Sequence, residues 1–356
     1  MSEFDKYIVQ GEPDKKAKAN AWQTAIGLQD VDGLKPSEYL IKTAVQHIEG
    51  DITIDQVKDL LDTYYETKDV REHLDNERTE EADKVSARIT EILSEQSFSF
   101  TPDYLIRIHL RLFKGIYKHA GQLRDVNITK KEWVLNGDTV LYSNYDMLRE
   151  TLEYDFEQEK KTDYSVLNAD MAVKQICKFV SGIWQIHPFR EGNTRTTAVF
   201  TMKWLQTFGF SVDNNVFKDN SWYFRNALVR ANYNNIPKRI YATSEYLELF
   251  FRNLVFGEQN KLSNRSMLAV ELQSATPEIS KSQNGTLNDA LDCNLDELAL
   301  LRFVKENPNA TQVEIAKHIG KSERTVKRMT PALIERGLLE RENGKRNGKW
   351  VVKCEL

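Results

Sequence analysis

The sequence has few cysteines, no long apolar run and little net charge. Cys177, Cys293 and Cys354 are an odd number without metal-binding spacing, which argues against a disulfide framework and indicates a reducing compartment. No apolar stretch approaches membrane-spanning length, and the opening MSEFDKYIVQGEPDKK carries charges where a signal peptide needs an apolar core. The net charge of -4 argues against nucleic-acid binding by the whole chain. These features predict a cytoplasmic protein with no membrane partner.

The order of apolar and polar residues predicts a mainly α protein. Apolar residues recur at helical spacing through much of the chain. One β-rich interruption, NITKKEWVLNGDTVLYS, contains Asn136-Gly137, a pair that favours positive φ and therefore a tight β-hairpin. We expect an N-terminal helical module at 1–94, a central helical domain at 95–257, a polar linker at 258–289 and a C-terminal domain at 290–356.

One loop, HPFREGNTR, holds a varied set of polar groups between two helical patterns. Gly192 and Asn193 fall where the second helix begins, so free main-chain N–H groups there would attract a phosphate, with Arg195 beside it. Glu191 is suited to hold a Mg²⁺ ion that bridges phosphate oxygens. The imidazole of His187 can accept a proton from an attacking hydroxyl at neutral pH. Phosphoryl or nucleotidyl transfer requires this set of groups.

The same loop resembles the signature HxFx(D/E)GNGRxxR of the Fic family, and the likeness covers residues 95–256, including IRIHLRLFKGIYKHAGQLRDVNI. That family transfers a nucleotide monophosphate, usually AMP from ATP with Mg²⁺, to a hydroxyl side chain of a target protein. The resemblance implies a helical core with a β-hairpin flap. It also implies these roles: His187 as general base, Glu191 as metal ligand, Gly192, Asn193 and Arg195 at the phosphates, and Asn232 near the base and ribose.

Two positions depart from the signature. Thr194 stands in place of the second glycine, and its hydroxyl can donate a hydrogen bond to phosphate. Ala198 stands in place of the second arginine, so a charge-assisted contact of about 1.5–3 kcal/mol is missing. The Doc toxins, a kinase-like branch, have lysine at the Thr194 position, and its absence here disfavours phosphotransfer. We expect slow transfer or an altered nucleotide preference.

The predicted hairpin WVLNGDTVLYS resembles the flap of the family. A strand edge here can pair with the main chain of an extended target segment and bring a hydroxyl into line for attack. The residues expected to form this edge are Asp138, Thr139, Val140, Leu141 and Tyr142.

The N-terminal module resembles the family's antitoxin module, whose inhibitory motif is (S/T)xxxE(G/N). In AWQTAIGLQDVDGLKPSEYL, Leu28 takes the hydroxyl position, Asp32 the glutamate position, and Gly33 follows. A second stretch, VQHIEGDI, keeps Glu49 before a glycine but lacks the hydroxyl residue. In the family the glutamate pairs with the second arginine and blocks the terminal phosphate. Because Asp32 is one methylene shorter and Ala198 is uncharged, we expect the inhibitory ion pair to be absent.

The C-terminal sequence predicts a winged helix-turn-helix. TQVEIAKHIGKSERTVKRMTPALIERGLL gives two helices, the second capped by Ser322, and ERENGKRNGKWVV gives a short hairpin. Residues 311–356 contain eleven Lys or Arg against six Glu, so this part is locally basic. Arg324, Lys327 and Arg328 lie early on the second helix, where they would contact DNA. Protein contacts or dimerisation through the same fold are the alternative.

These patterns favour a protein adenylyltransferase that uses ATP and Mg²⁺ to modify a Ser, Thr or Tyr hydroxyl of a target protein or of itself. One alternative is a DNA-binding regulator whose core senses a nucleotide without transferring it. The other is a Doc-like phosphotransferase. A homodimer is left open.

Overall fold

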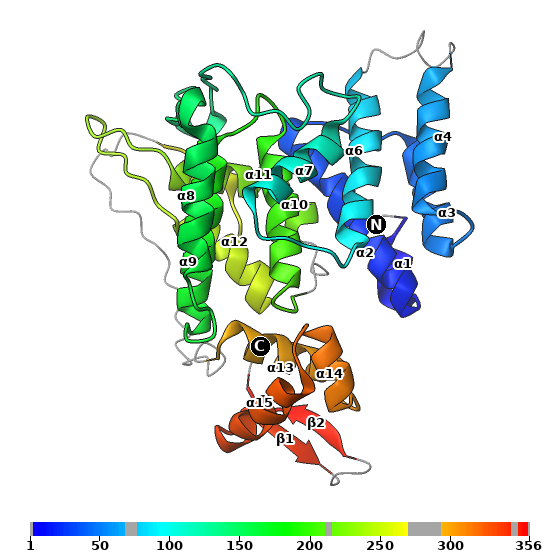
Figure 1. Ribbon diagram of the computed structural model, residues 1–356. Coiled ribbons are helices and arrows are strands. Elements are labelled where there is room, and N and C mark those ends of the chain that lie inside the picture. Colours follow the sequence, from blue (N-terminus) through cyan, green and yellow to red (C-terminus); the bar gives the residue numbers. More distant parts are fainter. Residues whose placement is uncertain (1–2, 68–76, 211–215, 270–292, 343–347, 355–356) are drawn as a thin grey trace.

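The computed structural model describes residues 3–67, 77–210, 216–269, 293–342 and 348–354. These residues form a mainly helical molecule, as the sequence predicts. N-terminal helices lie beside a central helical domain, and a smaller C-terminal unit with a two-stranded sheet lies below it in Figure 1.

The N-terminal module has its own apolar core and is joined to the central domain through its last helix. The core includes Phe4, Trp22, Leu40 and Leu61. The elements are α1 (Asp5–Gln10), α2 (Pro13–Gly27), the 3-10 helix η1 (Leu28–Asp32), α3 (Glu38–Glu49), α4 (Ile54–Glu66) and α6 (Glu77–Ser94). Because α6 packs on α2 and α4 and also on α7 (Pro102–Phe113) of the central domain, the module lies directly against that domain.

The central domain is built around one fully enclosed helix. Its main helices are α7 (Pro102–Phe113), α8 (Leu148–Lys160), α9 (Ala169–Ile186), α10 (Asn193–Gln206), α11 (Val216–Ala231) and α12 (Glu245–Phe256). All residues of α10 from Asn193 to Leu205 are buried, and α10 packs on α6, α7 and α9. A helix buried on every side is held rigidly by its neighbours, so the loop at its N-terminus has a fixed base.

The predicted flap turns where expected but does not form a β-ladder. Asn136 and Gly137 adopt φ values of 54° and 88°, which confirms the tight turn. The segment folds instead as the 3-10 helix η2 (Trp133–Leu135), and the main chain closes through Gly137 N–H to Glu132 C=O at 3.0 Å. Val134 and Leu135 both enter the core, which two neighbouring residues of a flat strand do not do. The expected strands at this position are therefore corrected to a compact loop.

The start of the expected linker packs on this loop. The 3-10 helix η4 (Asn264–Met267) buries Met267, and the N–H of Ala269 donates to the carbonyl of Val134 at 2.7 Å. Residues 258–269 therefore belong to the surface of the central domain. Residues 270–289 of the expected linker lie outside the described residues.

The C-terminal unit has the order of elements that the sequence predicts. It contains α13 (Leu295–Glu306), α14 (Gln312–His318), α15 (Glu323–Glu335), β1 (Leu339–Glu342) and β2 (Lys349–Val352). Ser322 caps α15 through the N–H of Thr325, and β1 pairs antiparallel with β2, with Leu339 opposite Val352. The unit packs on the central domain where Gly209 meets Ile319. The two main chains are so close that a Cβ on Gly209 would lie 2.9 Å from the Ile319 Cα.

Within the described residues, every helix is too short or too polar to cross a membrane.

Candidate active site

The loop between α9 and α10 has left-handed backbone at both ends. His187 ends α9 with φ 51°, and Gly192 precedes α10 with φ 71°. A Cβ on Gly192 would lie 2.4 Å from the Phe113 ring, so this position needs glycine both for its φ and for the close packing. The first N–H groups of α10 have no acceptor within the helix, so an anion could bind at this end.

We expect Gly192→Ala to lower the free energy of unfolding by about 1–3 kcal/mol, because the added methyl group is strained at positive φ and displaces the Phe113 ring. Thermal unfolding measures the change. Gly182→Ala is the matched control, since its methyl group would meet only Asp155 Oδ2 at 3.4 Å within a regular helix. An equal Tm for the two variants would contradict the assignment of strain to the loop.

His187 has the form that a general base needs. Its side chain is 3% exposed, and its Nδ1 lies 3.3 Å from the carbonyl of Trp184. Its Nε2 is buried and has no hydrogen-bond partner among the described residues. Burial and the nearby cation Lys130 hold the pKa of His187 well below its ordinary value of 6.5. The ring is therefore neutral, with Nδ1–H donated to Trp184 and a free lone pair on Nε2.

The loop is fixed by side chains that bind its main chain. The amide of Asn193 donates to the Phe189 carbonyl at 2.7 Å and accepts from the Phe189 N–H at 2.9 Å. The Phe189 ring stacks on His109 at 3.7 Å, and His109 Nε2 lies 3.1 Å from the Glu191 carbonyl. Both polar atoms of the Asn193 side chain are thus engaged, so a phosphate at this helix start would meet the Asn193 main-chain N–H.

His109 is held in one neutral form. Its Nδ1 accepts from the Gly121 N–H at 2.8 Å, so its Nε2–H is the donor to Glu191. Burial lowers the pKa of His109 to about 3. No sequence pattern singles out this histidine, because its role depends on a contact between residues 82 positions apart.

Arg124 ties the end of α9 to the flap and was also not identified from the sequence. The buried guanidinium donates to the carbonyls of His187 and Val126, both at 2.8 Å, and to that of Ser143. A cation at a helix C-terminus also stabilises the negative end of the helix dipole. Arg124 therefore holds the peptide group of His187 and the flap in one arrangement.

Arg195 is enclosed by the N-terminal module, and this corrects the expectation that Asp32 has no cationic partner. Only 1% of the Arg195 side chain is exposed. Its Nε lies 2.9 Å from Asp32 Oδ2, and its Nη2 donates to Glu81 Oε1 at 2.5 Å. Gln29 accepts from Nη1 at 3.0 Å, and the Tyr117 hydroxyl accepts from Nη2 at 3.1 Å. The ion pair uses the first arginine of the signature instead of the second.

The charge on Arg195 is stable in this setting. Burial lowers the pKa of Arg195, but Asp32, Tyr117 and Glu81 together raise it by more. Asp32 reaches the guanidinium because η1 carries it against α10. Glu81 comes from α6, a helix outside the motif considered in the sequence, and no local sequence pattern pointed to it.

The structure places Asp32, and not Glu49, at the predicted phosphate site. Glu49 pairs with Lys15 at 2.6 Å and accepts from the Tyr7 hydroxyl, all within the N-terminal module. Of the two candidate inhibitory stretches, only the one that contains Asp32 and Gly33 therefore contacts the signature loop in this structure.

Thr194 and Ala198, the two positions that depart from the signature, are both packed against neighbouring residues, and so is Asn232. Thr194 Oγ1 accepts from the Trp184 indole N–H at 2.9 Å, which leaves the hydroxyl hydrogen free for a phosphate. Ala198 is fully buried. The Asn232 amide donates to the carbonyls of Ser181 at 3.1 Å and Leu228 at 2.9 Å, so it joins α11 to α9. The two amide N–H groups of Asn232 are therefore not available to a nucleotide in this arrangement.

The flap residues lie over the predicted base. The Tyr142 ring centroid is 4.2 Å from that of His187, and the Leu141 carbonyl accepts from Gln185 at 3.1 Å. Val140 is buried, while Leu141 is 84% exposed. Asp138 Oδ2 accepts from the Tyr233 hydroxyl at 2.6 Å. The predicted flap segment is therefore held at Asp138 by Tyr233, which follows α11, and at Tyr142 by His187, with Thr139 between these two contacts.

A cavity of about 650 Å³ lies between the N-terminal module and the loop. Its lining includes Glu191, Asp32 and Glu81, together with the cations Arg78 and Arg225. Glu191 is largely exposed, with Lys130 Nζ 3.7 Å from its carboxylate. One exposed carboxylate suffices for Mg²⁺, which keeps most of its waters and shares phosphate oxygens, so these residues fit a metal–nucleotide complex.

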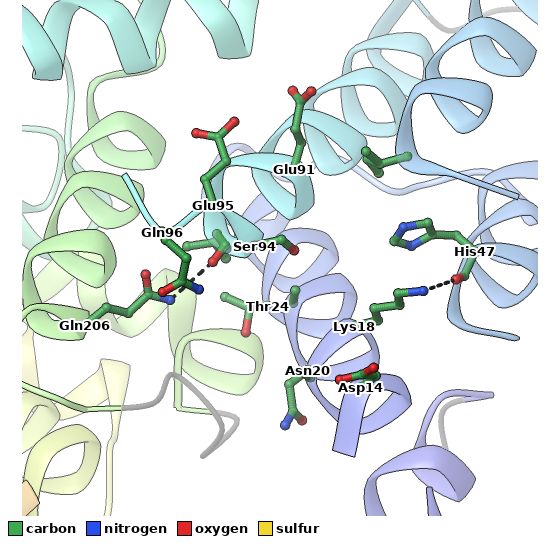
Figure 2. Close-up of a pocket in the computed structure, with 14 residues that line it drawn as sticks. Asp14, Lys18, Asn20, Thr24, His47, Glu91, Ser94, Glu95, Gln96 and Gln206 are labelled. Carbon is green, nitrogen blue, oxygen red and sulfur yellow. Dashed lines mark hydrogen bonds between the residues drawn. The ribbon is translucent and has the colours of Figure 1, made fainter. Parts of the chain in front are cut away.

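A second cavity, of about 620 Å³, lies between the N-terminal module and Gln206 at the end of α10 (Figure 2). It is bordered by α2, by His47 of α3 and by the end of α6, and Lys18 donates to the His47 carbonyl at 3.1 Å. No residue of the signature loop lines it. Of these two cavities, the first is the one that the signature loop lines, through Glu191.

The predicted DNA-binding residues share an exposed face of α15. Arg324, Lys327 and Arg328 are exposed, while Val326 and Leu333 pack inward. Lys327 pairs with Glu323 at 3.0 Å on the helix surface. The face is thus available to a partner outside the central domain.

Comparisons with known proteins agree with the two folded units. Residues 99–205 match the Fic/DOC family, and residues 297–340 match a winged helix-turn-helix DNA-binding family. The chain is also similar to the protein adenylyltransferase VbhT of Bartonella schoenbuchensis, with 27% identity over 118 residues. That alignment covers 33% of this chain and 23% of the relative, so less than a quarter of the relative's length is matched.

Proposed function

The chain carries a Fic domain and a C-terminal winged helix-turn-helix, and from this premise we propose that it is a protein adenylyltransferase. The observation that carries the proposal is the unpartnered Nε2 of a neutral His187, beside the N-terminus of α10 and beneath Tyr142 of the flap. A free lone pair next to an anion-binding end suits proton removal from a hydroxyl that attacks a phosphate.

In the proposed reaction, the hydroxyl oxygen of the target forms a bond to the α-phosphorus of ATP. The bond from that phosphorus to the bridging oxygen of the β-phosphate breaks, and pyrophosphate leaves. His187 Nε2 takes the hydroxyl proton. The N–H groups at the start of α10 and the Thr194 hydroxyl hold phosphate oxygens. Mg²⁺ on Glu191, when bound, neutralises charge on the phosphates.

The structure represents a state in which Arg195 is held by the N-terminal module. The guanidinium cannot contact a phosphate while Asp32 and Glu81 enclose it. We infer that the module keeps transfer slow until it loosens. Because Ala198 supplies no charge, Arg195 is the signature's remaining arginine for the phosphates.

The test is incubation with Mg²⁺ and ATP labelled at either the α or the γ phosphate. Label from the α phosphate on the chain or on added proteins supports AMP transfer. Label from the γ phosphate would instead support a phosphotransferase, and neither label would support a nucleotide-sensing regulator. The nucleotide-sensing regulator has its own support, since Ala198 leaves the terminal phosphate without the family's arginine.

We also propose that the winged helix binds DNA through the exposed face of α15. Arg324→Ala combined with Lys327→Ala should weaken binding and reduce the slope of log affinity against log salt by about 0.9 for each lost phosphate contact. Electrophoretic or fluorescence titrations at several salt concentrations measure both quantities. Lys160→Ala, on α8 of the central domain, is the control. Binding that does not vary with salt, or that is unchanged in the double variant, would leave protein contacts as the role of this unit.

A further inference from the structure

The segment between α11 and α12 forms a small projecting hairpin (Figure 1). The residues at its tip are apolar and basic. Asn235 and Ile240 pair antiparallel, and the four residues between them are exposed: Ile236, Pro237, Lys238 and Arg239. Ile236 is 72% exposed. A single exposed apolar residue is common on protein surfaces, so the tip is of interest only together with the charged and apolar groups around it.

The hairpin is built firmly enough to present these side chains in one arrangement. The Asn235 N–H donates to the Ile240 carbonyl at 2.8 Å, and the Ile240 N–H donates back at 3.0 Å. The Arg239 N–H donates to the Ile236 carbonyl at 2.9 Å. Arg239 adopts φ 54°, which is unfavourable for a residue with a long side chain and is kept only because the surrounding bonds require it.

The base of the hairpin is fastened to the flap. Asp138 Oδ2 accepts from the Tyr233 hydroxyl at 2.6 Å and lies 3.5 Å from Asn235 Nδ2. From Asp138 the flap continues to Tyr142, which contacts His187. Four residues span at most about 14 Å. An extended segment along the flap would therefore reach from His187 to the base of the hairpin in about four residues, and the long side chains of Lys238 and Arg239 extend from the tip next to it.

The tip carries two exposed cations. Within the described residues, neither Lys238 nor Arg239 lies within ion-pair distance of a carboxylate. The hydrogen bond from Tyr233 lowers the pKa of Asp138 at the base of the hairpin, and the charge of Lys238 adds a weaker contribution. Leu141 on the flap is 84% exposed and Tyr241 beyond the hairpin is 60% exposed. Two free cations among exposed apolar groups complement a partner that carries both acidic and apolar side chains.

We propose that the hairpin tip is a specificity site for the target protein, which reads acidic residues about four positions from the modified hydroxyl. This inference rests on the proposed AMP transfer. Lys238 and Arg239 bind the acidic side chains, while Ile236 and Leu141 pack on apolar neighbours. The apolar groups favour a protein segment over a nucleic acid, whose backbone offers phosphates without apolar side chains.

The test uses fluorescent peptides with a central tyrosine, serine or threonine and aspartates about four residues to either side, compared with matched lysine peptides. Binding is measured by anisotropy without nucleotide, so the result does not depend on catalysis. The intact chain should prefer the aspartate peptides by about five-fold. Lys238→Glu combined with Arg239→Glu should reverse that preference, and Ile236→Ser should weaken binding to both sets.

Lys161→Glu, an exposed cation at the end of α8, is the matched control and should leave the preference unchanged. Equal affinity for aspartate and lysine peptides, or a preference that survives the double charge reversal, would overturn the proposal. So would tighter binding of a single-stranded oligonucleotide at the same tip. Absence of label from α-labelled ATP would overturn AMP transfer alone, because peptide binding is read separately.

Discussion

His187→Ala is expected to reduce AMP transfer by about 10²–10⁴-fold, with nucleotide affinity largely retained. The substitution removes the unpartnered Nε2 that takes the hydroxyl proton, whereas the N–H groups at the start of α10 remain. Label transfer from α-labelled ATP measures the rate, and calorimetric titration with ATP and Mg²⁺ measures binding. Transfer near the wild-type rate would remove His187 from the mechanism.

The control variant for this experiment needs a residue that tolerates the positive φ of position 187. Its φ of 51° is tolerated better by asparagine than by alanine, so His187→Asn keeps the loop while lacking a base at neutral pH. Both variants should be inactive, but only His187→Ala should show a lower Tm. An active His187→Asn variant would mean that the histidine acts through the loop's shape.

The depressed pKa of His187 also fixes the sign of the pH dependence. Because burial and Lys130 lower this pKa, the neutral ring persists below the ordinary value of 6.5. A base works only while unprotonated, so we expect the acid limb of the rate profile to fall below pH 6.5. A rate that already declines as the pH drops from 8 to 7 would contradict this assignment.

Asp32→Asn combined with Glu81→Gln is expected to raise automodification by about ten-fold or more. The two carboxylates hold the almost fully buried Arg195 at 2.9 and 2.5 Å, while Asp32 itself is 35% exposed. Without them the guanidinium is a buried charge lacking its ionic partners, so the module should separate from α10 and free Arg195 for the phosphates. Hydrogen exchange in α2 and η1 should increase in parallel.

Asp32→Gly alone should raise automodification only slightly. The sequence predicts this on the ground that Asp32 has no partner, but the structure gives a different reason: Glu81 continues to hold Arg195. Glu80→Gln, on the same helix and paired with Lys84, is the matched control, and Glu49→Gly is a second one. A large rise in either control, or an unchanged rate in the double variant, would show that Arg195 is not the point of inhibition.

Much of the fold could be predicted because its signals are local. The start of α10 at Asn193 follows from a glycine and an apolar pattern, and the cap at Ser322 follows from one hydroxyl before a helix. The turn at Asn136 was likewise predicted from a dipeptide. The sequence does not predict the compact loop that flanks this turn. The side chains of Val134 and Leu135 enter the core together, and this packing overrides strand propensity.

The residues proposed for the chemistry can be found in the sequence, because a histidine, a carboxylate and a glycine before a helix fall within a single loop, with Thr194 and Ala198 where the family differs. The groups that hold this loop and Arg195 can be found only in the folded chain. Arg124, His109 and Glu81 act on the loop from 63, 82 and 114 positions away. Contacts over such separations depend on how helices pack, and sequence periodicity reports which face of a helix is buried without saying what lies against it.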